Sequence, residues 1–199
     1  MNLTIFKEAD YRRMPWKNGL GVTCEIRREP PEEAGDFVWR VSIADIKENG
    51  PFSKFADYMR VICTLEGRGM FLTVDGVKTH PLLPYDPFVF HGASVVESEL
   101  IDGPIRDFNL IYRPDLFNAR MKWLNTHSSK TVESAASRLL IFTVKGVEFS
   151  CGDKAASLEP FSTLEINNAE HNNLTVKLAG PSDTPDNYCC FIEIDEIKK

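Results

Sequence analysis

The sequence has no excess of positive charge. Its 199 residues include 23 lysines and arginines against 29 aspartates and glutamates, which gives a formal net charge of −6. Proteins that bind the phosphate backbone of nucleic acids carry basic patches or stripes, and anionic membrane surfaces attract the same kind of protein surface. The charge balance therefore argues against nucleic acid and against a membrane as partners.

Long apolar runs are missing as well. No stretch approaches the roughly 20 apolar residues that a membrane-spanning helix needs. The first residues, "MNLTIFKEADYRR", carry charges where a signal peptide has its apolar segment. We therefore expect a cytoplasmic protein.

Cysteines are few and are not spaced as a framework. There are five, an odd number, and no CxxC spacing occurs. This argues against a set of disulfides and against a zinc knuckle. Cys24 and Cys63 stand in alternating stretches, where cysteine usually behaves as a small apolar residue. No GxSxG motif is present, so we expect no cysteine or serine nucleophile.

Histidines are too scattered for a clustered metal site. A zinc or iron(II) site needs three or more convergent ligands. No two of the four histidines are close enough in sequence to share one strand face: His80, His91, His127 and His171. A site assembled in space, for example from His91 and Glu25, stays open, but we expect no metal and no other cofactor.

Period-two alternation is abundant. In "FVWRVSIADI" the apolar side chains from Phe37 to Ile43 fall on one face, and Arg40 and Ser42 fall on the other. Asp75-Gly76 stands between two alternating runs and predicts a tight hairpin turn. Regular spacing of such runs between proline and glycine clusters predicts an all-β sandwich or barrel.

One segment is predicted to be helical. In "RPDLFNARMKWLNTHS", Asp115 can cap the start, and Phe117, Met121 and Leu124 fall at i, i+4 and i+7. The stretch 64–90 before this segment and the stretch 143–166 after it share an outline of strands and turns. We expect two related β-barrel halves, residues 1–113 and 136–199, joined by a helical linker at 114–135.

The stretch "MPWKNGLGVTCEI", Met14 to Ile26, combines Trp16 and Asn18 with Gly19 and Gly21. Glycine suits positive φ or a close approach of another group. The pattern is neither GxxxxGK[ST] nor GxGxxG, and it opens a strand instead of a helix, so a phosphate loop is disfavoured. Two compatible interpretations stay open: a barrel corner with Trp16 as a core plug, or the wall of a pocket.

Five sequence blocks together resemble the HutD/Ves family. They occur in the family's order and spacing across Met14 to Arg113: "RMPWKNGLGVTCEI", "FVWRVSIADI", "GPFSKFADYMRVICTLEGRGMFL", "PFVFHG" and "LIDGPIRDFNLIYR". The C-terminal half matches only in general pattern, and Leu20 stands where the family usually has a further glycine. The resemblance implies a cupin-type β-barrel of the two-domain, or bicupin, kind.

The resemblance also implies a function that is weakly characterised. Some members are associated with bacterial histidine utilisation, where sensing of a pathway metabolite has been proposed, and others are described as stress-induced proteins. Many cupins bind metal through a His-x-His pair with a glutamate on one hairpin. Here the corresponding positions fall inside "PFSKFADYMRV", which contains no histidine.

Polar side chains occupy one face of two alternating stretches. Arg60 shares its face with Ile62 and Thr64, and Asp107 shares its face with Asn109. In a small closed barrel one face of each strand points to the interior, where a charge must be paired or must meet a ligand. Either Arg60 and Asp107 form a buried ion pair, or Arg60 grips a carboxylate bidentately.

We expect these residues to form a ligand-binding pocket without a catalytic residue. Its predicted members are Trp16, Asn18, Glu25, Arg60, Asp107 and Asn109, which also fall in the family's blocks. The favoured function is non-enzymatic binding of a small carboxylate-bearing metabolite. Two alternatives stay open, an isomerase or hydrolase with Glu25 or Asp107 as its acid or base, and a protein-binding scaffold. A homodimer is a further open expectation.

Overall fold

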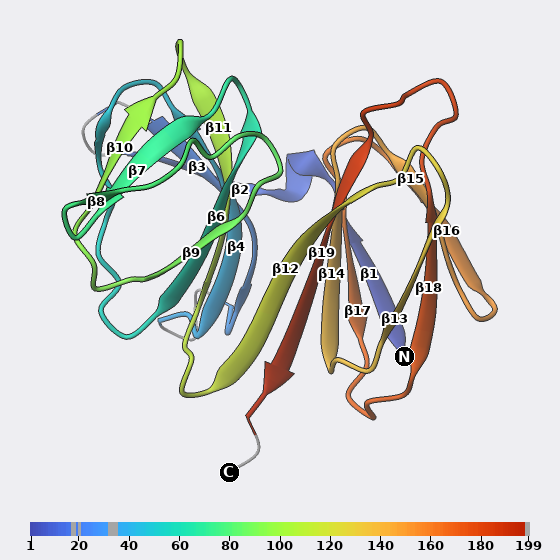
Figure 1. Ribbon diagram of the computed structural model, residues 1–199. Coiled ribbons are helices and arrows are strands. Elements are labelled where there is room, and N and C mark those ends of the chain that lie inside the picture. Colours follow the sequence, from blue (N-terminus) through green and yellow to red (C-terminus); the bar gives the residue numbers. More distant parts are fainter. Residues whose placement is uncertain (17–18, 20, 32–35, 198–199) are drawn as a thin grey trace. The chain divides into compact units, whose positions relative to one another are not determined.

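The alternating stretches form antiparallel strands throughout the computed structural model of the protein, which describes all residues except 17, 18, 20, 32–35, 198 and 199. The chain forms two compact units (Figure 1). We call Tyr11–Leu116 the cavity unit. We call the other the C-terminal unit, which combines Met1–Asp10 with Phe117–Lys199. The first ten residues thus belong with the end of the chain, whereas the predicted N-terminal half ran from residue 1 to 113.

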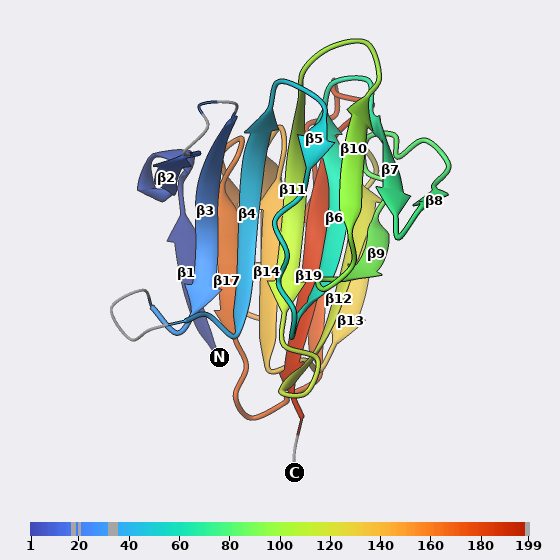
Figure 2. The same cartoon turned by 90° about the vertical axis from the view of Figure 1, so that its left-hand side faces the viewer.

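The cavity unit contains two sheets. Its six-stranded sheet has the order β2 (Arg12–Pro15), β3 (Gly21–Glu29), β4 (Trp39–Ile46), β11 (Ile105–Tyr112), β6 (Met59–Glu66) and β9 (Phe88–His91). Its four-stranded sheet has the order β5 (Gly50–Pro51), β10 (Val96–Leu100), β7 (Met70–Val74) and β8 (Val77–Lys78). Figure 2 shows β3, β4, β11 and β6 running side by side in the larger sheet.

One face of the six-stranded sheet supplies the core of the cavity unit. Ile46, Ile62 and Ile105 from this face form an apolar cluster with residues of the smaller sheet, among them Met70 and Leu72. Because side chains alternate along a strand, Arg60, Asp107 and Asn109 lie on the same face as this cluster. One face of the sheet thus carries an apolar region, which belongs to the core, and next to it a region of polar side chains.

The C-terminal unit also contains two sheets. One has the order β1 (Asn2–Phe6), β17 (Thr163–Asn167), β14 (Arg138–Thr143), β19 (Tyr188–Glu196) and β12 (Phe117–Asn125). The other has the order β13 (Lys130–Ser134), β18 (Leu174–Ala179), β15 (Val147–Cys151) and β16 (Lys154–Leu158). A short 3₁₀ turn, η1 (Glu8–Asp10), follows β1. The all-β fold class is confirmed.

The helix predicted in the linker is wrong. Residues Phe117–Asn125 form strand β12, which pairs with β19 along its whole length, from Phe117↔Glu196 to Asn125↔Tyr188. Phe117 and Met121 are four residues apart, a spacing that fits period two as well as a helical period. Together with Ala119 they form the less exposed side of an alternating strand. Pairing with β19 therefore overrides the local helical pattern.

The hairpin predicted at Asp75-Gly76 is confirmed. Strand β7 ends at Val74, β8 begins at Val77, and Val74 pairs with Val77 across the turn. Asp75 and Gly76 both have positive φ, 48° and 85°, as the two central residues of a type I′ turn require. Among the described residues no helix is long and apolar enough to cross a membrane.

Candidate functional site

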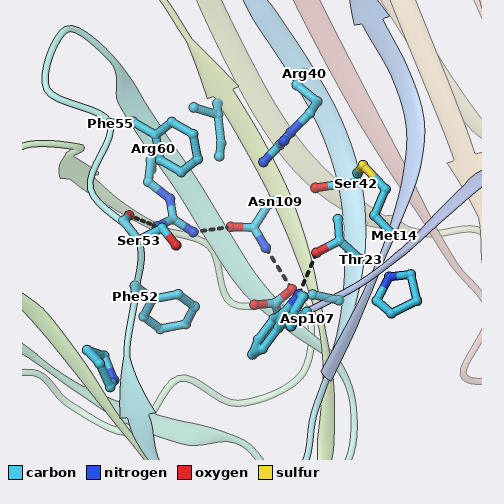
Figure 3. A pocket seen from close by; sticks show the side chains of 15 residues that line it. Met14, Thr23, Arg40, Ser42, Phe52, Ser53, Phe55, Arg60, Asp107 and Asn109 are labelled. Carbon is cyan, nitrogen blue, oxygen red and sulfur yellow. Dashed lines mark hydrogen bonds between the residues drawn. The ribbon is translucent and has the colours of Figure 1, made fainter. Parts of the chain in front are cut away.

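The cavity unit contains an open cavity of about 550 Å³. Strands β2, β3, β4, β6 and β11 and the segment 51–55 supply its walls, which are shown in Figure 3. The residues that line it are Met14, Pro15, Trp16, Thr23, Arg40, Ser42, Ala44, Pro51, Phe52, Ser53, Phe55, Arg60, Asp107, Asn109 and Ile111. The cavity size and the mixture of apolar walls with a few polar groups are typical of a small-molecule site.

Strand register sets the order of the polar groups. β11 lies between β4 and β6, so each residue of β11 on the cavity side has one neighbour from each flanking strand. Three successive rows result: Arg40–Ile111–Arg60, Ser42–Asn109–Ile62 and Ala44–Asp107–Thr64. The two arginines thus share the first row, and Asp107 lies in the third. A register shift between Arg106 and Asp107 marks a β-bulge beside this carboxyl group, and such bulges can redirect a side chain.

Arg60 and Asp107 are connected through Asn109. Nη2 of Arg60 donates to Oδ1 of Asn109 at 2.8 Å, and Nδ2 of Asn109 donates to Oδ1 of Asp107 at 2.6 Å (Figure 3). Because guanidinium is only a donor, it fixes the orientation of the Asn109 amide. The sequence left two roles open for Arg60, an ion pair with Asp107 or a grip on a ligand carboxylate. In the structure Asn109 lies between Arg60 and Asp107 and forms a hydrogen bond with each of them.

Burial dominates the electrostatics of Asp107. Its side chain is fully buried, and burial raises the pKa of its carboxyl group to about 7. The Arg60 charge, the Asn109 amide and the backbone of Ala44 act in the opposite direction. Within the described part of the chain, Oδ2 of Asp107 has no hydrogen-bond partner of normal geometry. The result is a carboxyl group that can change its protonation state near neutral pH.

Aromatic rings surround Arg60. Its guanidinium carbon lies 5.0 Å from the ring centre of Phe52, 5.1 Å from that of Phe90 and 5.6 Å from that of Phe55. Nη1 also donates to the backbone oxygen of Ser53 at 3.2 Å. Burial lowers the pKa of Arg60 to about 10, so the side chain remains a cation at neutral pH.

Arg40 is a second arginine of the cavity, and the predicted site did not include it. Its guanidinium carbon lies 4.7 Å from the ring centre of Phe37 and 5.6 Å from that of Phe55. Burial lowers its pKa, and the negative charge of Glu25 opposes that shift. None of the residues that the structure describes forms a hydrogen bond or an ion pair with Arg40. The sequence contains a signal for Arg40, because it alternates with the apolar residues of its strand and so falls on the same face as Ser42.

Trp16 lies in the wall of the cavity, and its indole Nε1 donates to Oγ1 of Thr23 at 2.9 Å. Gly21 makes this position possible. A Cβ at residue 21 would lie 2.4 Å from the backbone oxygen of Asp45 and 2.9 Å from the Trp16 ring. The glycine therefore permits two close approaches, one to strand β4 and one to the indole.

The remaining predicted site residues differ in their placement. Asn18 lies outside the described residues. Glu25 is buried on β3, where it pairs with Ser42 in register, but it does not line the cavity. The four histidines are not among the lining residues either. In the described ranges, no three histidine, cysteine, aspartate or glutamate side chains form a group that could hold a metal ion.

The chain matches known proteins over most of its length. The HutD family model matches residues 8–183. An uncharacterized 21.2 kDa protein in the hutC 3′ region of Pseudomonas putida is 49% identical over 148 residues, which cover 74% of this chain and 77% of that protein. Protein Ves of Citrobacter koseri is 39% identical over 150 residues, covering 73% of this chain and 75% of that protein.

Solved structures agree with this relationship. HutD from Pseudomonas fluorescens SBW25, determined in a formate condition, has a TM-score of 0.84 at 40% identity, covering 99% of this chain and 100% of that one. A conserved protein of unknown function from Pseudomonas aeruginosa PAO1 has a TM-score of 0.90 at 39% identity, with coverages of 99% and 100%. A bacterial pirin from Escherichia coli is only 13% identical and shares the fold alone, with a TM-score of 0.66 and coverages of 98% and 100%. The chain belongs to the HutD family.

Proposed function

We propose that this protein binds a small carboxylate-bearing metabolite in the cavity, without catalysis and without a metal, as a sensor or regulator. The observation that carries the proposal is the row of two arginines, Arg40 and Arg60, on the cavity side of one sheet. A guanidinium group is suited to hold a carboxylate with two parallel hydrogen bonds.

The walls of the cavity suit a metabolite of this kind. Phe52 and Phe55 provide apolar contact area beside the arginines, and Ser42 and Asn109 provide orienting polar groups. A few polar groups in a mostly apolar concavity both bind a small molecule and fix its orientation. Rings close to both guanidiniums also stabilise the cations while the cavity is empty.

The names of relatives connect the family to histidine utilisation. One curated relative is described by its place in the hutC 3′ region, and one solved relative is called HutD. These relatives support a carboxylate from histidine breakdown as the first class of ligand to test.

Asp107 supports a second candidate function, an isomerase or hydrolase. Its carboxyl group lines the cavity and has a pKa of about 7, which is the range in which a general acid or base works best at neutral pH. Glu25 does not line the cavity, so Asp107 is the acid or base in this alternative. A bound ligand that is recovered chemically unchanged favours the sensor, whereas conversion of the ligand favours the enzyme.

Native mass spectrometry of freshly purified protein and thermal shifts test the proposal together. We expect a retained small molecule, or stabilisation of the protein by urocanate, formiminoglutamate or formate. A ligand at 100 times its Kd stabilises the folded state by about 2.7 kcal/mol. In Arg60→Met the ligand-induced shift should be lost, because the variant removes a guanidinium and the support of Asn109.

Arg106→Met is the matched control. Arg106 also lies on the six-stranded sheet, but it pairs with Asp45 and Glu66 and does not line the cavity. The control removes the same charge and should keep the ligand-induced shift. If no carboxylate stabilises the wild type and no small molecule is retained, the proposed function is wrong.

A further inference from the structure

We propose that the ligand has two recognised ends, a carboxylate that binds Arg40 and a hydrogen-bond donor, such as an amide N–H, that binds Oδ2 of Asp107. The inference rests on the proposed function and names the class of ligand for the same cavity. It assigns ligand selection to Arg40 and Asp107, and it assigns Arg60 mainly a positioning role.

Arg60 is already engaged inside the protein. It donates to Asn109 and to the backbone of Ser53, and only 4% of the residue is exposed. Releasing it to a ligand would leave Oδ1 of Asn109 and the oxygen of Ser53 without these donors. Asn109 is buried, and a buried acceptor that is left unsatisfied destabilises the protein. Arg60 is therefore better suited to hold Asn109 in one orientation than to act as the main ligand anchor.

Arg40 has the opposite character. It lines the cavity, and no hydrogen bond or ion pair to the described residues uses its donors. Phe37 and Phe55 hold the guanidinium by ring contacts, which leave the edges of the group available. Glu25 is a nearby negative charge, but it closes no ion pair with Arg40 among the described contacts. A planar donor group that is positioned by rings and not by acceptors fits a ligand carboxylate.

Asp107 presents an acceptor at a different place in the cavity. Its Oδ1 accepts from Asn109, whereas Oδ2 is buried and has no hydrogen-bond partner of normal geometry in the described part of the protein, although the backbone of Ala44 also favours the charged carboxylate. Because Arg60 donates to Oδ1 of Asn109, the NH₂ group of Asn109 points toward Asp107. Turning the Asn109 amide over would break its hydrogen bonds to both Arg60 and Asp107. A buried acceptor that lines a cavity and lacks a donor is satisfied best by a donor on the ligand.

The spacing of the two groups suits one small molecule. Arg40 and Asp107 lie in the first and third cross-strand rows, four residues apart along the strand direction. This corresponds to an offset of about 13 Å along the strands, part of which the arginine side chain spans. A ligand with a few bonds between its carboxylate and its donor would fill the remainder. While Asp107 is ionised, a second carboxylate at its end would bring acceptor against acceptor and is disfavoured.

Three isosteric pairs of probes test the donor end on the intact protein. Each pair has an amide N–H in one member and a CH₂ in the other: N-acetylglycine with 4-oxopentanoate, N-acetyl-β-alanine with 5-oxohexanoate, and 4-acetamidobutanoate with 6-oxoheptanoate. Calorimetric titration is done at a pH above the pKa of Asp107. At the best chain length we expect the amide to bind about tenfold tighter than its ketone, because the ketone leaves Oδ2 unsatisfied.

Two variants assign the two ends. Asp107→Asn is nearly isosteric, and its amide can still accept from Asn109 while it presents a donor in place of Oδ2. We expect it to reduce the amide-to-ketone ratio to less than about twofold and to change ketone binding little. Arg40→Gln should weaken both members of a pair by the same factor, about tenfold or more, and leave their ratio unchanged.

Each contrary outcome identifies what has failed. Equal affinities within all three pairs for the wild type overturn the inference, as does an unchanged ratio in Asp107→Asn or unchanged affinities in Arg40→Gln. If formate or urocanate stabilises the protein but none of the six probes binds, the proposed function survives and the inference fails. If no carboxylate binds at all, both fail. If Asp107→Asn does not fold, the wild-type ratios alone decide.

Discussion

Asp107 combines complete burial with incomplete hydrogen bonding. It accepts a hydrogen bond from Asn109, and the charge of Arg60 and the backbone of Ala44 also favour its charged form, but its second oxygen has no hydrogen-bond partner of normal geometry among the described residues. These contacts do not compensate for the loss of water around the charged form, which is why its pKa is raised to about 7. Its protonation therefore couples the stability of the cavity unit to pH.

We predict that the contribution of Asp107 to stability falls as the pH rises from about 4 to about 7. An unfolded aspartate has a pKa of about 3.9, so within this window the folded state binds more protons than the unfolded state. Stability then decreases with rising pH, by on the order of 1 kcal/mol per pH unit. Arg60, with a pKa of about 10, stays charged throughout.

Urea unfolding at a series of pH values compares the wild type with Asp107→Asn. The difference in unfolding free energy, wild type minus variant, should decrease between about pH 4 and 7 and then level off. Subtracting the variant removes the titration of the other carboxyl groups, which both proteins share. A difference that is flat, or that increases with pH, would contradict the raised pKa.

The sequence predicts which face of its strand each polar cavity residue occupies, but it does not predict which strands lie side by side. Alternation placed Arg60 with Thr64, and Asp107 with Asn109, on common faces, and it grouped Arg40 with Ser42. What the sequence did not contain was the pairing of β11 with both β4 and β6, which brings Arg40 into the same row as Arg60. Glu25 belongs to the predicted site because it falls in one of the family's blocks. In the structure it is buried on β3 opposite Ser42 and is not among the residues that line the cavity.

At the scale of the element, strands joined by a tight turn could be predicted from the sequence. A strand whose partner is distant in the sequence could not. The β7–β8 hairpin has its own Asp-Gly turn, so local sequence specifies it. Strand β12 depends on β19, which lies more than sixty residues later in the chain. A local pattern cannot reveal that partner, and a spacing of four residues satisfies both helix and strand. The helix prediction failed for this reason.

The pairing of β2 with β3 also places Trp16, and this leads to a prediction for Gly21. The backbone N–H of Trp16 donates to the oxygen of Gly21 at 2.9 Å, and the indole covers this glycine. Gly21→Ala would clash with the oxygen of Asp45 and with the indole. We expect Trp16 to be displaced, with a loss of about 1–3 kcal/mol in stability and weaker ligand binding.

Gly50→Ala is the control, because no atom lies within 4 Å of a Cβ built at that glycine. Thermal unfolding and ligand-induced changes in tryptophan fluorescence are measured for both variants. Trp39 and Trp123 also emit, so Trp16→Phe identifies the part of the signal that belongs to Trp16. A Gly21→Ala protein with unchanged stability and an unchanged fluorescence response would remove Trp16 and Gly21 from the site.

At the scale of the whole molecule, the two ends of the chain build one unit. Strand β1 pairs with β17 from Asn2↔Asn167 to Phe6↔Thr163, and Leu3 packs against the apolar core of the C-terminal unit. Figure 1 shows β1 beside β17 and β14 in that unit. The cavity unit is therefore inserted in the sequence between β1 and the rest of the C-terminal unit. Changes in the first residues should act on the C-terminal unit and not on the cavity.

This connectivity predicts the effect of Leu3→Asp. A carboxylate at this position would be placed against Ile166 of β17 and the apolar core, at a cost of about 1–3 kcal/mol. Hydrogen exchange should accelerate in β1, β17 and β14, while β4, β6 and β11 keep their protection and the cavity keeps its response to carboxylates. Ile5→Asp, at a residue that is 41% exposed on the same strand, should have a smaller effect. Faster exchange in the cavity strands of Leu3→Asp, with β17 unchanged, would contradict the assignment of β1 to the C-terminal unit.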